Sequence, residues 1–548
     1  MPAVSRFYFL ALTWSSCLAN TISLSSTPSP AASGTLTHAV ASLASDVLVS
    51  PSAKSALEAK LTTNADLAAL LSGQSANQSN LVSLACYTAR VALGADMVQQ
   101  MSTTNATEVD LNWSSTCWDT PSCAILPGSD SEVSKTMKII TFFGAKFSVR
   151  SGGHSPNPGW ADIGQPGILI DLQRLNGIAL SPDQSVLSVG PGARWGDVYQ
   201  TLDNTKVTVI GGRIEDVGVG GLILGGGYFH FSNQYGLAAD NVKNFRVVLA
   251  DGTVTDANAT HNSDLFWALK GGGPNFGIVT QFDLETISLP EIWYEASMYS
   301  LDKVPDLFDA FATWQQNSSD ARSAAALVVN LDYAVVSLMY TEPVATRPAI
   351  FEPFNAISAE EVVVPASNGT VGTLIGLMGA DGAPDSQPRR DYRSVSSKVD
   401  AELYKEVYGF WQPLAAQVHE ATGATQTFTI QPVSANLAAM GNAKGGNPLG
   451  LAEEDTQWWT TLIYWANARD DEAVRSVSIA TEEKWKQLGE ERGAAEKFRY
   501  MNDASRDQDP LSTYGYTNLG KLKSIARKYD PREVFQHLQN DGFLLSKV

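Results

Sequence analysis

Short apolar runs, each bounded by glycine or turn-forming residues, dominate the chain between about residues 119 and 289. Runs of this length are typical of strands. Residues 250–253, Ala-Asp-Gly-Thr, lie between two such runs and predict a tight hairpin. Trp195, Val198 and Leu202 have the spacing of one helix face, which predicts a short helix between strands. The strands are predicted over residues 146–149, 168–170, 186–189, 207–210, 245–249 and 278–284.

The pattern changes after Pro290, where glycine becomes rarer and the amphipathic stretches become longer. Apolar residues at helical spacing predict helices there, and alternating apolar residues predict strands. The helices are predicted around 304–311 and over 470–491, and the strands over 325–331 and 459–465. We therefore expect a second α+β domain over residues 290–500.

The two ends of the chain differ from these domains. Residues 20–118 are rich in Ser, Thr, Ala and Asn and contain a predicted helix over 57–71, which indicates a lead-in segment partly docked on the glycine-rich domain. Near the other end, a helix predicted over 522–528 stops before Pro531, because proline cannot continue it.

The first 19 residues have the pattern of a secretory signal peptide. Arg6 precedes an apolar run over 7–14 that is too short to span a bilayer, and the small residues Cys17 and Ala19 precede the expected cleavage. We therefore expect a secreted protein. Six Asn-x-Ser/Thr sequences agree with secretion, although several must occur by chance: Asn77, Asn105, Asn112, Asn258, Asn317 and Asn368.

Removal of the leader leaves three cysteines, Cys86, Cys117 and Cys123, which allow one internal disulfide with three possible pairings. A metal site is not expected, because no histidine neighbours them. The 548 residues carry 38 Lys and Arg against 57 Asp and Glu, a net charge of −19. Such a surface repels phosphate backbones and anionic lipids, so neither nucleic acid nor a membrane is an expected partner.

Glycine is concentrated between Gly152 and Gly227, where 17 of 76 residues are glycine. Three clusters, at 150–155, 217–227 and 270–279, each adjoin a predicted strand. Glycine lets backbone N–H groups approach an oxyanion closely, so converging clusters predict a pyrophosphate site built from amides. Taken singly, each cluster is also what tight turns in a β-rich domain require. No G-x-G-x-x-G pattern is present, which disfavours a Rossmann site.

The ordered motifs resemble FAD-linked oxidoreductases of the vanillyl-alcohol-oxidase type, in their berberine-bridge-enzyme-like branch. They are Arg-Ser-Gly-Gly-His at 150–154, the strand 167–172, the 217–227 run, the hairpin at 250–252, Asp264 to Gly277, and Tyr-Asp-Pro-Arg-Glu-Val-Phe at 529–535. The resemblance is strong over 119–289 and moderate over 495–540.

The resemblance implies an α+β fold in which a two-subdomain PCMH-type FAD-binding domain is joined to an antiparallel-sheet substrate domain that covers the flavin. The expected divisions are a signal peptide (1–19), a lead-in segment (20–118), the FAD-binding domain (119–289), the substrate domain (290–500) and a C-terminal segment that returns to the FAD domain (501–548).

The family's cofactor contacts fall on all three glycine clusters of this chain. The implied FAD-binding residues are Arg150, Ser151, Gly152, Gly153, His154, Ser155, Gly218, Gly220, Gly221, Asn275, Gly277, Ile278 and Val279.

Among these, His154 is expected to bond covalently to the flavin 8α-methyl carbon, for which neutral imidazole is a suitable nucleophile. Members with two covalent links carry a cysteine where this chain has Ile214, so a single link is implied. The branch also implies a Cys86–Cys123 disulfide, with Cys117 left over.

The implied catalytic residues are Tyr500 and Asn502, from the family's Tyr-x-Asn pattern, and Val217. Tyr500 is a candidate base for substrate deprotonation, with positioning or packing as the alternative. Many relatives carry another tyrosine where this chain has Asp503, which leaves the identity of the base open. Val217 corresponds to a position beside flavin C4a, where valine is associated with oxidases. His230 follows the second cluster and has a core role or faces the flavin.

The expected function is a secreted, monomeric FAD oxidase that removes hydride from an alcohol or amine-type carbon of a small molecule and reduces oxygen to hydrogen peroxide. Secondary-metabolite biosynthesis is the favoured setting. An extracellular carbohydrate oxidase is the second possibility, mildly disfavoured by Ile214. A flavin-loaded protein without enzymatic activity is the third.

Overall fold

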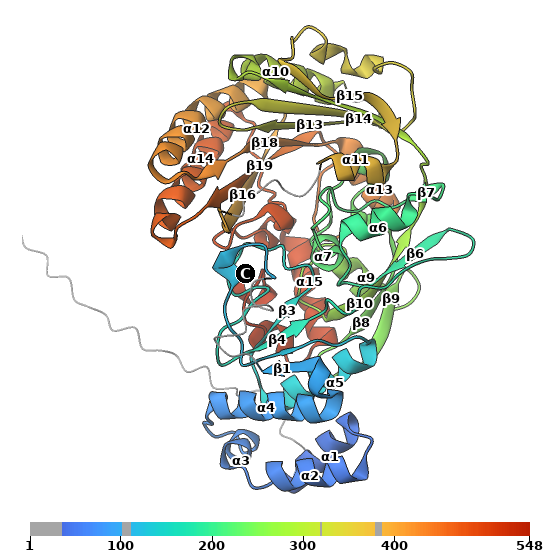
Figure 1. Ribbon diagram of the computed structural model, residues 1–548, viewed down its shortest axis with the longest axis vertical. Helices are drawn as coiled ribbons and strands as arrows, with labels where there is room; N and C mark the ends of the chain where they lie inside the picture. The colour runs from blue at the N-terminus through green and yellow to red at the C-terminus, as the bar shows by residue number, and fades with distance from the viewer. Residues whose placement is uncertain (1–35, 101–110, 318–319, 379–385) are drawn as a thin grey trace, which may run out of the picture.

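The protein is elongated and has three tiers, which are stacked along its long axis (Figure 1). This computed structural model describes residues 36–100, 111–317, 320–378 and 386–548. The predicted signal peptide and Asn105 lie outside the described residues. No helix in the described ranges has the length and apolarity required to cross a bilayer.

Four helices form the N-terminal tier: α1 (Leu36–Val47), α2 (Pro51–Leu61), α3 (Ala65–Leu71) and α4 (Gln78–Leu93). The single helix predicted over 57–71 is wrong. The chain leaves the helix after Leu61, and Asn64 begins the next one by accepting the N–H of Leu67 on its side chain, a strong helix-start signal. The disulfide Cys86–Cys123, predicted from the resemblance, is confirmed, and it joins α4 to the middle tier. Cys117 is a buried free thiol.

Two sheets form the middle tier. The four-stranded sheet has the order β1 (Val98–Gln100), β2 (Cys123–Ile125), β4 (Ile168–Asp171), β3 (Phe147–Arg150). The five-stranded sheet has the order β5 (Ile178–Leu180), β6 (Val186–Val189), β10 (Ile278–Glu285), β8 (Val242–Val248), β9 (Val254–Asn258). The predicted hairpin joins β8 to β9.

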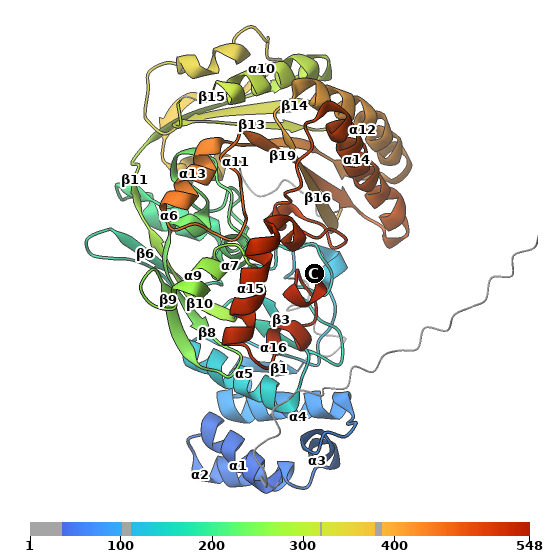
Figure 2. The same ribbon diagram turned by 180° about the vertical axis from the view of Figure 1, so that it is seen from behind.

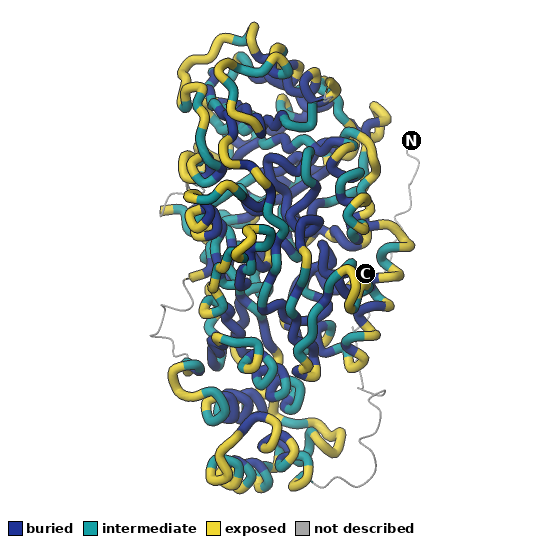
Figure 3. Tube along the Cα trace, turned by 90° about the vertical axis from the view of Figure 1, so that its right-hand side faces the viewer, coloured by how far each residue is buried: buried dark blue, intermediate teal, exposed yellow. Residues whose placement is uncertain are grey.

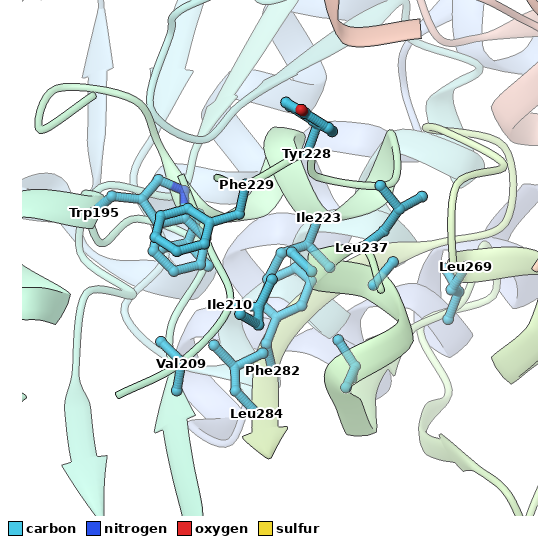
Figure 4. Close-up of a cluster of buried hydrophobic side chains, with 14 of the residues drawn as sticks. Trp195, Val209, Ile210, Ile223, Tyr228, Phe229, Leu237, Leu269, Phe282 and Leu284 are labelled. Atoms are coloured by element: carbon cyan, nitrogen blue, oxygen red, sulfur yellow. The ribbon is translucent and has the colours of Figure 1, made fainter. Parts of the chain in front are cut away.

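Short helices and one small strand pair complete this tier. The predicted helix is confirmed as α6 (Trp195–Leu202), whereas the strand predicted over 207–210 is only β7 (Val207–Thr208), paired with β11 (Ile287–Ser288). The other helices are α5 (Asp130–Phe143), α7 (Val219–Leu224), α8 (Ser232–Tyr235) and α9 (Ser263–Leu269). Ile223 of α7 packs in a core with Phe229 and Phe282, and Tyr228 lies at the edge of that core (Figure 4).

The third tier is one large antiparallel sheet, which confirms the predicted α+β class. Its path is β15 (Glu361–Gly369), β12 (Ile292–Tyr299), β14 (Ala334–Tyr340), β13 (Ser323–Val329), β18 (Phe428–Val433), β19 (Thr456–Trp465), β16 (Arg389–Lys398), and β17 (Thr425–Gln426) also pairs with β19. One face is covered by α10 (Val304–Gln316), α12 (Ala401–Thr422) and α14 (Asp471–Arg492) (Figure 1). The remaining helices are α11 (Val371–Met378) and α13 (Ala435–Ala443).

Successive residues of β19 point to opposite faces of the sheet, as in any strand. Trp459 contacts Trp485 of α14 on the helix-covered face. Trp458 instead stacks on Tyr500, at a ring separation of 4.5 Å. The even-numbered residues of β19 therefore face the middle tier, and this face is available to close a site between the two tiers.

The C-terminal segment runs back along the middle tier (Figure 2). It contains α15 (Tyr516–Tyr529) and α16 (Val534–His537), and α15 begins six residues before the predicted helix. Beyond α16, the chain pairs with β3: Phe147 N–H donates to Leu538 O at 3.0 Å, and Asn540 N–H donates to Phe147 O at 2.7 Å. The last residues are thus part of the middle tier's structure.

The asparagines of the predicted glycosylation sites differ in how far they are buried. Exposed residues gather on the outer loops and the N-terminal helices (Figure 3). Asn77, Asn317 and Asn368 are exposed, and Asn258 is half-buried. Asn112 is only 3 % exposed and donates its amide N–H to Cys117 O at 2.8 Å. The folded protein therefore does not present Asn112 to a glycosyltransferase.

Candidate active site

The first two glycine clusters meet in the middle tier. A Cβ added to Gly152 would lie 2.4 Å from Gly218 Cα, and a Cβ on Gly220 would lie 2.7 Å from Ser151 Oγ. Side chains do not fit at such short distances. The two loops can therefore touch only because each carries glycine at the point of contact. Within the described residues, the N–H groups of Ser151, Gly152 and Gly153 have no protein acceptor. Consecutive free amides form a nest that fits a pyrophosphate.

Arg150, the residue before the nest, holds the loop in place through an ion pair. Nε and Nη2 of its guanidinium both donate to Oδ2 of Asp171, the last residue of the adjacent strand β4, and both side chains are at most 2 % exposed. Ser151 hydroxyl donates to Pro191 O. The charge of Arg150 is thus balanced by a carboxylate, and its structural effect is to hold the loop that carries the free amides.

The third cluster contacts the second cluster and the C-terminal segment. Gly273 N–H donates to Leu224 O at the end of α7, at 3.0 Å. Asn275 donates its amide to Phe543 O at 2.9 Å and accepts the N–H of Leu545 at 3.0 Å. Gly277, Ile278 and Val279 follow, with Ile278 and Val279 at the start of β10. Asn275, predicted as a cofactor contact, therefore fastens the C-terminal segment.

His154 lies beside aromatic and cationic residues from other parts of the chain. Trp113 stacks on its ring at 4.3 Å and 18°. The guanidinium of Arg390, on β16, lies 4.9 Å from the centre of the Trp113 ring, and Tyr464 of β19 meets that ring at 6.2 Å. No signal in the sequence pointed to Trp113 or Arg390.

A cavity of about 420 Å³ opens next to His154. Its lining combines the nest residue Gly152 with two cations, Arg194 and Arg390. The rest of the wall is formed by Leu111, Asn112, Trp113, Trp118, Asp216 and Pro388. The site thus offers cations beside the amides, although the sequence had indicated amides alone.

The Tyr-x-Asn pattern is seated on the second glycine cluster. Asn502 packs on Gly225, where a Cβ would lie 1.9 Å from Asn502 Oδ1, and it donates to Leu222 O at 2.9 Å. Tyr500 Oη accepts the N–H of Tyr228 at 2.7 Å and the amide of Asn502 at 3.0 Å. Burial raises the pKa of Tyr500 well above its ordinary value. The structure thus brings both residues to the cluster that carries Val217.

Asp503 follows directly and faces the large sheet. Gln431 of β18 donates its amide to Asp503 Oδ2 at 2.7 Å. Burial raises the pKa of Asp503, while the charge of Arg213 and the Gln431 hydrogen bond act in the opposite direction. A carboxyl group whose pKa is shifted by burial beside a specific cation is a candidate functional group.

The remaining predicted residues have simpler surroundings. Val217 and Ile214 are half-buried in the loop before α7, and Val217 O accepts the N–H of Trp195 at 3.1 Å. Ile214 has no sulfur for a second covalent link. His230 is buried, and burial lowers its pKa to about 3, so it is a neutral core residue. The described ranges contain no cluster of His, Cys, Asp and Glu suited to a metal ion.

Comparison with known proteins agrees with this geometry. Residues 121–258 match the family model described as an FAD binding domain. An FAD-dependent monooxygenase of Arthrobotrys oligospora is 39 % identical over 80 % of this chain and 85 % of its own. The bifunctional solanapyrone synthase of Alternaria solani is 34 % identical over 79 % and 83 %.

Two solved structures share the fold. Xylooligosaccharide oxidase of Myceliophthora thermophila has a TM-score of 0.68 at 20 % identity, over 84 % of this chain and 99 % of its own. 6-Hydroxy-D-nicotine oxidase of Arthrobacter nicotinovorans has a TM-score of 0.67 at 21 % identity, over 81 % and 97 %.

Proposed function

Because this chain belongs to the FAD-linked oxidoreductases of the vanillyl-alcohol-oxidase type, we propose that it is a secreted oxidase acting on an alcohol or amine-type carbon of a small organic substrate. The supporting observation is the arrangement around one interface: the amide nest, His154 and the Tyr500–Asn502 pair all lie between the middle tier and the open face of the large sheet. Secondary-metabolite biosynthesis is the proposed setting, since a similar protein is named solanapyrone synthase.

The residues present fit FAD. The free N–H groups of Ser151 to Gly153 suit its pyrophosphate, and His154 suits attachment through one ring nitrogen. Bound flavin supplies an acceptor for the hydride of the substrate C–H bond. The protein's own residues would orient the substrate against the flavin and accept its proton. We propose one covalent link, because Ile214 cannot form a thioether.

A panel of candidate substrates tests this proposal. Each is mixed anaerobically with the purified protein while the flavin absorbance is followed. Bleaching by secondary-metabolite alcohols supports the proposal, and bleaching by sugars alone supports a carbohydrate oxidase instead. Absence of bleaching by any compound, in a protein that carries flavin, supports a protein without oxidoreductase activity.

Monooxygenation is a second candidate, because the similar protein of Arthrobotrys oligospora carries that name. A monooxygenase inserts one atom of oxygen into its product, whereas an oxidase releases both as hydrogen peroxide. Turnover under ¹⁸O₂ separates the two: label in the product indicates a monooxygenase, and one hydrogen peroxide per product without label indicates an oxidase.

Val217 provides a prediction about the oxygen reaction. Val217→Leu adds one methylene in a close-packed loop, where such a change decides whether a diatomic molecule fits. We expect slower reoxidation of the reduced flavin by air and nearly unchanged anaerobic reduction by substrate. Stopped-flow spectroscopy measures both rates. Equal reoxidation rates in the two proteins would show that Val217 does not control oxygen access.

Secretion leads to a prediction about glycans. If the chain passes through the secretory pathway, the exposed Asn77, Asn317 and Asn368 are the expected acceptors, and the buried Asn112 is not. Peptide mapping after enzymatic removal of N-glycans identifies the occupied asparagines. Glycan at Asn112, or none on protein recovered from the culture medium, would contradict this expectation.

A further inference from the structure

We propose that the carboxylate of Asp503 accepts the proton that the substrate loses, and that Tyr500 remains a neutral phenol that positions the site. This inference rests on the proposed oxidase function. In the reaction, the substrate C–H bond breaks and its electron pair leaves as hydride to the bound flavin. The substrate O–H bond also breaks, its proton goes to Asp503, and a C=O bond forms.

Asp503 lies where the two tiers meet. It ends the short helical turn η7 (Met501–Asp503), which Asn502 fixes to the second glycine cluster through Leu222. Its other contact is Gln431 of β18, at 2.7 Å. Gln431 pairs in register with Trp458, the residue that stacks on Tyr500. The carboxylate is therefore held between the Tyr-x-Asn pattern and the face of the sheet that carries Gln431 and Trp458.

Tyr500 is poorly suited to accept the proton. Its side chain is only 2 % exposed, and burial raises its pKa by more than the N–H groups of Tyr228 and Asn502, which favour the phenolate, lower it. The negative charge of Asp503 raises the pKa of Tyr500 further. Two neighbouring buried acids do not both ionise, and a carboxyl group ionises about six pH units before a phenol. The proton therefore stays on Tyr500 while Asp503 is charged.

The surroundings of Asp503 make its carboxylate more basic than an exposed one. The ionisable groups that face it are Arg213, from the loop after β7, and the phenols of Tyr228, Tyr392 and Tyr500. Arg213 is the one cation among them, and it favours the charged carboxylate. Burial acts against that charge and makes the carboxylate more basic. Burial is the larger of these opposing effects, so the pKa of Asp503 lies above its ordinary value.

The adjoining sheet face offers unsatisfied polar groups. Within the described residues, Gln431 Oε1, Trp458 Nε1 and Thr460 Oγ1 are buried and have no hydrogen-bond partner. Trp458 and Thr460 are alternate residues of β19, so they share one face of the sheet. Buried polar groups usually have partners, and a substrate bearing hydroxyl or carbonyl oxygens supplies them. We infer that an oxygen-bearing substrate lies against this face beside Asp503.

The test compares Asp503→Asn with Tyr500→Phe, two nearly isosteric changes. We expect Asp503→Asn to keep its flavin content and visible spectrum but to slow anaerobic flavin reduction on the order of 10²–10⁴-fold, the usual range for a lost general base. The wild-type rate should fall as pH drops through the pKa of Asp503, and this acid limb should vanish in Asp503→Asn. Tyr500→Phe should slow reduction less than about tenfold and keep the limb.

Two further measurements make every outcome decisive. Gln431→Leu removes a hydrogen bond that favours the carboxylate, so the acid limb should move to higher pH. Infrared difference spectra recorded during a pH titration need no substrate, and they should show a protonated carboxyl band in the wild type that Asp503→Asn lacks. If no compound reduces the flavin of the wild-type protein, the proposed oxidase function is rejected. Unchanged infrared spectra, or equal reduction rates in Asp503→Asn and wild type, would overturn the role of Asp503.

Discussion

A Gly152→Ala protein is expected to purify with much less bound flavin than the wild type. The added methyl group would lie 2.4 Å from Gly218 Cα, and backbone cannot move aside as the end of a flexible side chain can. The two loops must separate, which displaces the free amides of Ser151 to Gly153 from the arrangement that fits a pyrophosphate. Overpacking of this kind costs about 1–3 kcal/mol, so affinity for FAD should fall on the order of tenfold to a hundredfold.

The ratio of flavin to protein absorbance after purification measures this effect. Gly177→Ala is the matched control, because Gly177 lies in the same tier but outside the three glycine clusters, and its Cβ would meet nothing within 4 Å. The control should bind flavin as the wild type does. Circular dichroism checks that the Gly152→Ala protein is folded. Full flavin content in Gly152→Ala would show that the nest does not hold the cofactor.

Replacement of His154 by alanine is expected to abolish covalent attachment. Wild-type protein precipitated with acid should remain yellow, and a peptide containing His154 should carry the mass of the flavin. In His154→Ala the imidazole nucleophile is absent, so all flavin should pass into the supernatant. Absorbance of the pellet and supernatant, with mass spectrometry of the peptides, measures the outcome.

His261→Ala serves as the control for this experiment, because His261 is an exposed residue on the loop after β9, outside the cavity lining. It should retain covalent flavin. Loss of colour from precipitated wild-type protein would reject the covalent link. Retention of colour in precipitated His154→Ala would move the link to another residue. Either result leaves the non-covalent fit of FAD to the nest unaffected.

Local patterns predicted individual elements well. The strand at 186–189 and the helix beginning at Trp195 were predicted with their observed limits, and the helix expected over 470–491 is α14, shifted by one residue. Periodicity within an element depends on which face is buried, and that information is contained in neighbouring residues. The helix predicted over 57–71 failed for an equally local reason, since Asn64 starts a new helix there.

The family was predicted from the ordered motifs, and the resemblance in turn implied the cofactor and the disulfide pairing. This was possible because each motif lies within a few consecutive residues. The contacts between residues of different motifs could not be predicted from these local patterns. Gly152 touches Gly218 across 66 residues of sequence, Tyr500 accepts an N–H from Tyr228, and Arg390 approaches His154 through Trp113. No periodicity relates the members of these pairs.

The base of the reaction shows the difference most clearly. From the chain alone, Tyr500 was a candidate base, and Asp503, where many relatives carry another tyrosine, left the identity of the base open. Only the packing of separate segments of the chain buries Tyr500, places Gln431 against the carboxylate and directs the N–H of Tyr228 to the phenol oxygen. Proton affinity depends on burial and on neighbouring charges and dipoles. Two of these neighbours are far away in the sequence: Gln431 lies 72 positions from Asp503, and Tyr228 lies 272 positions from Tyr500.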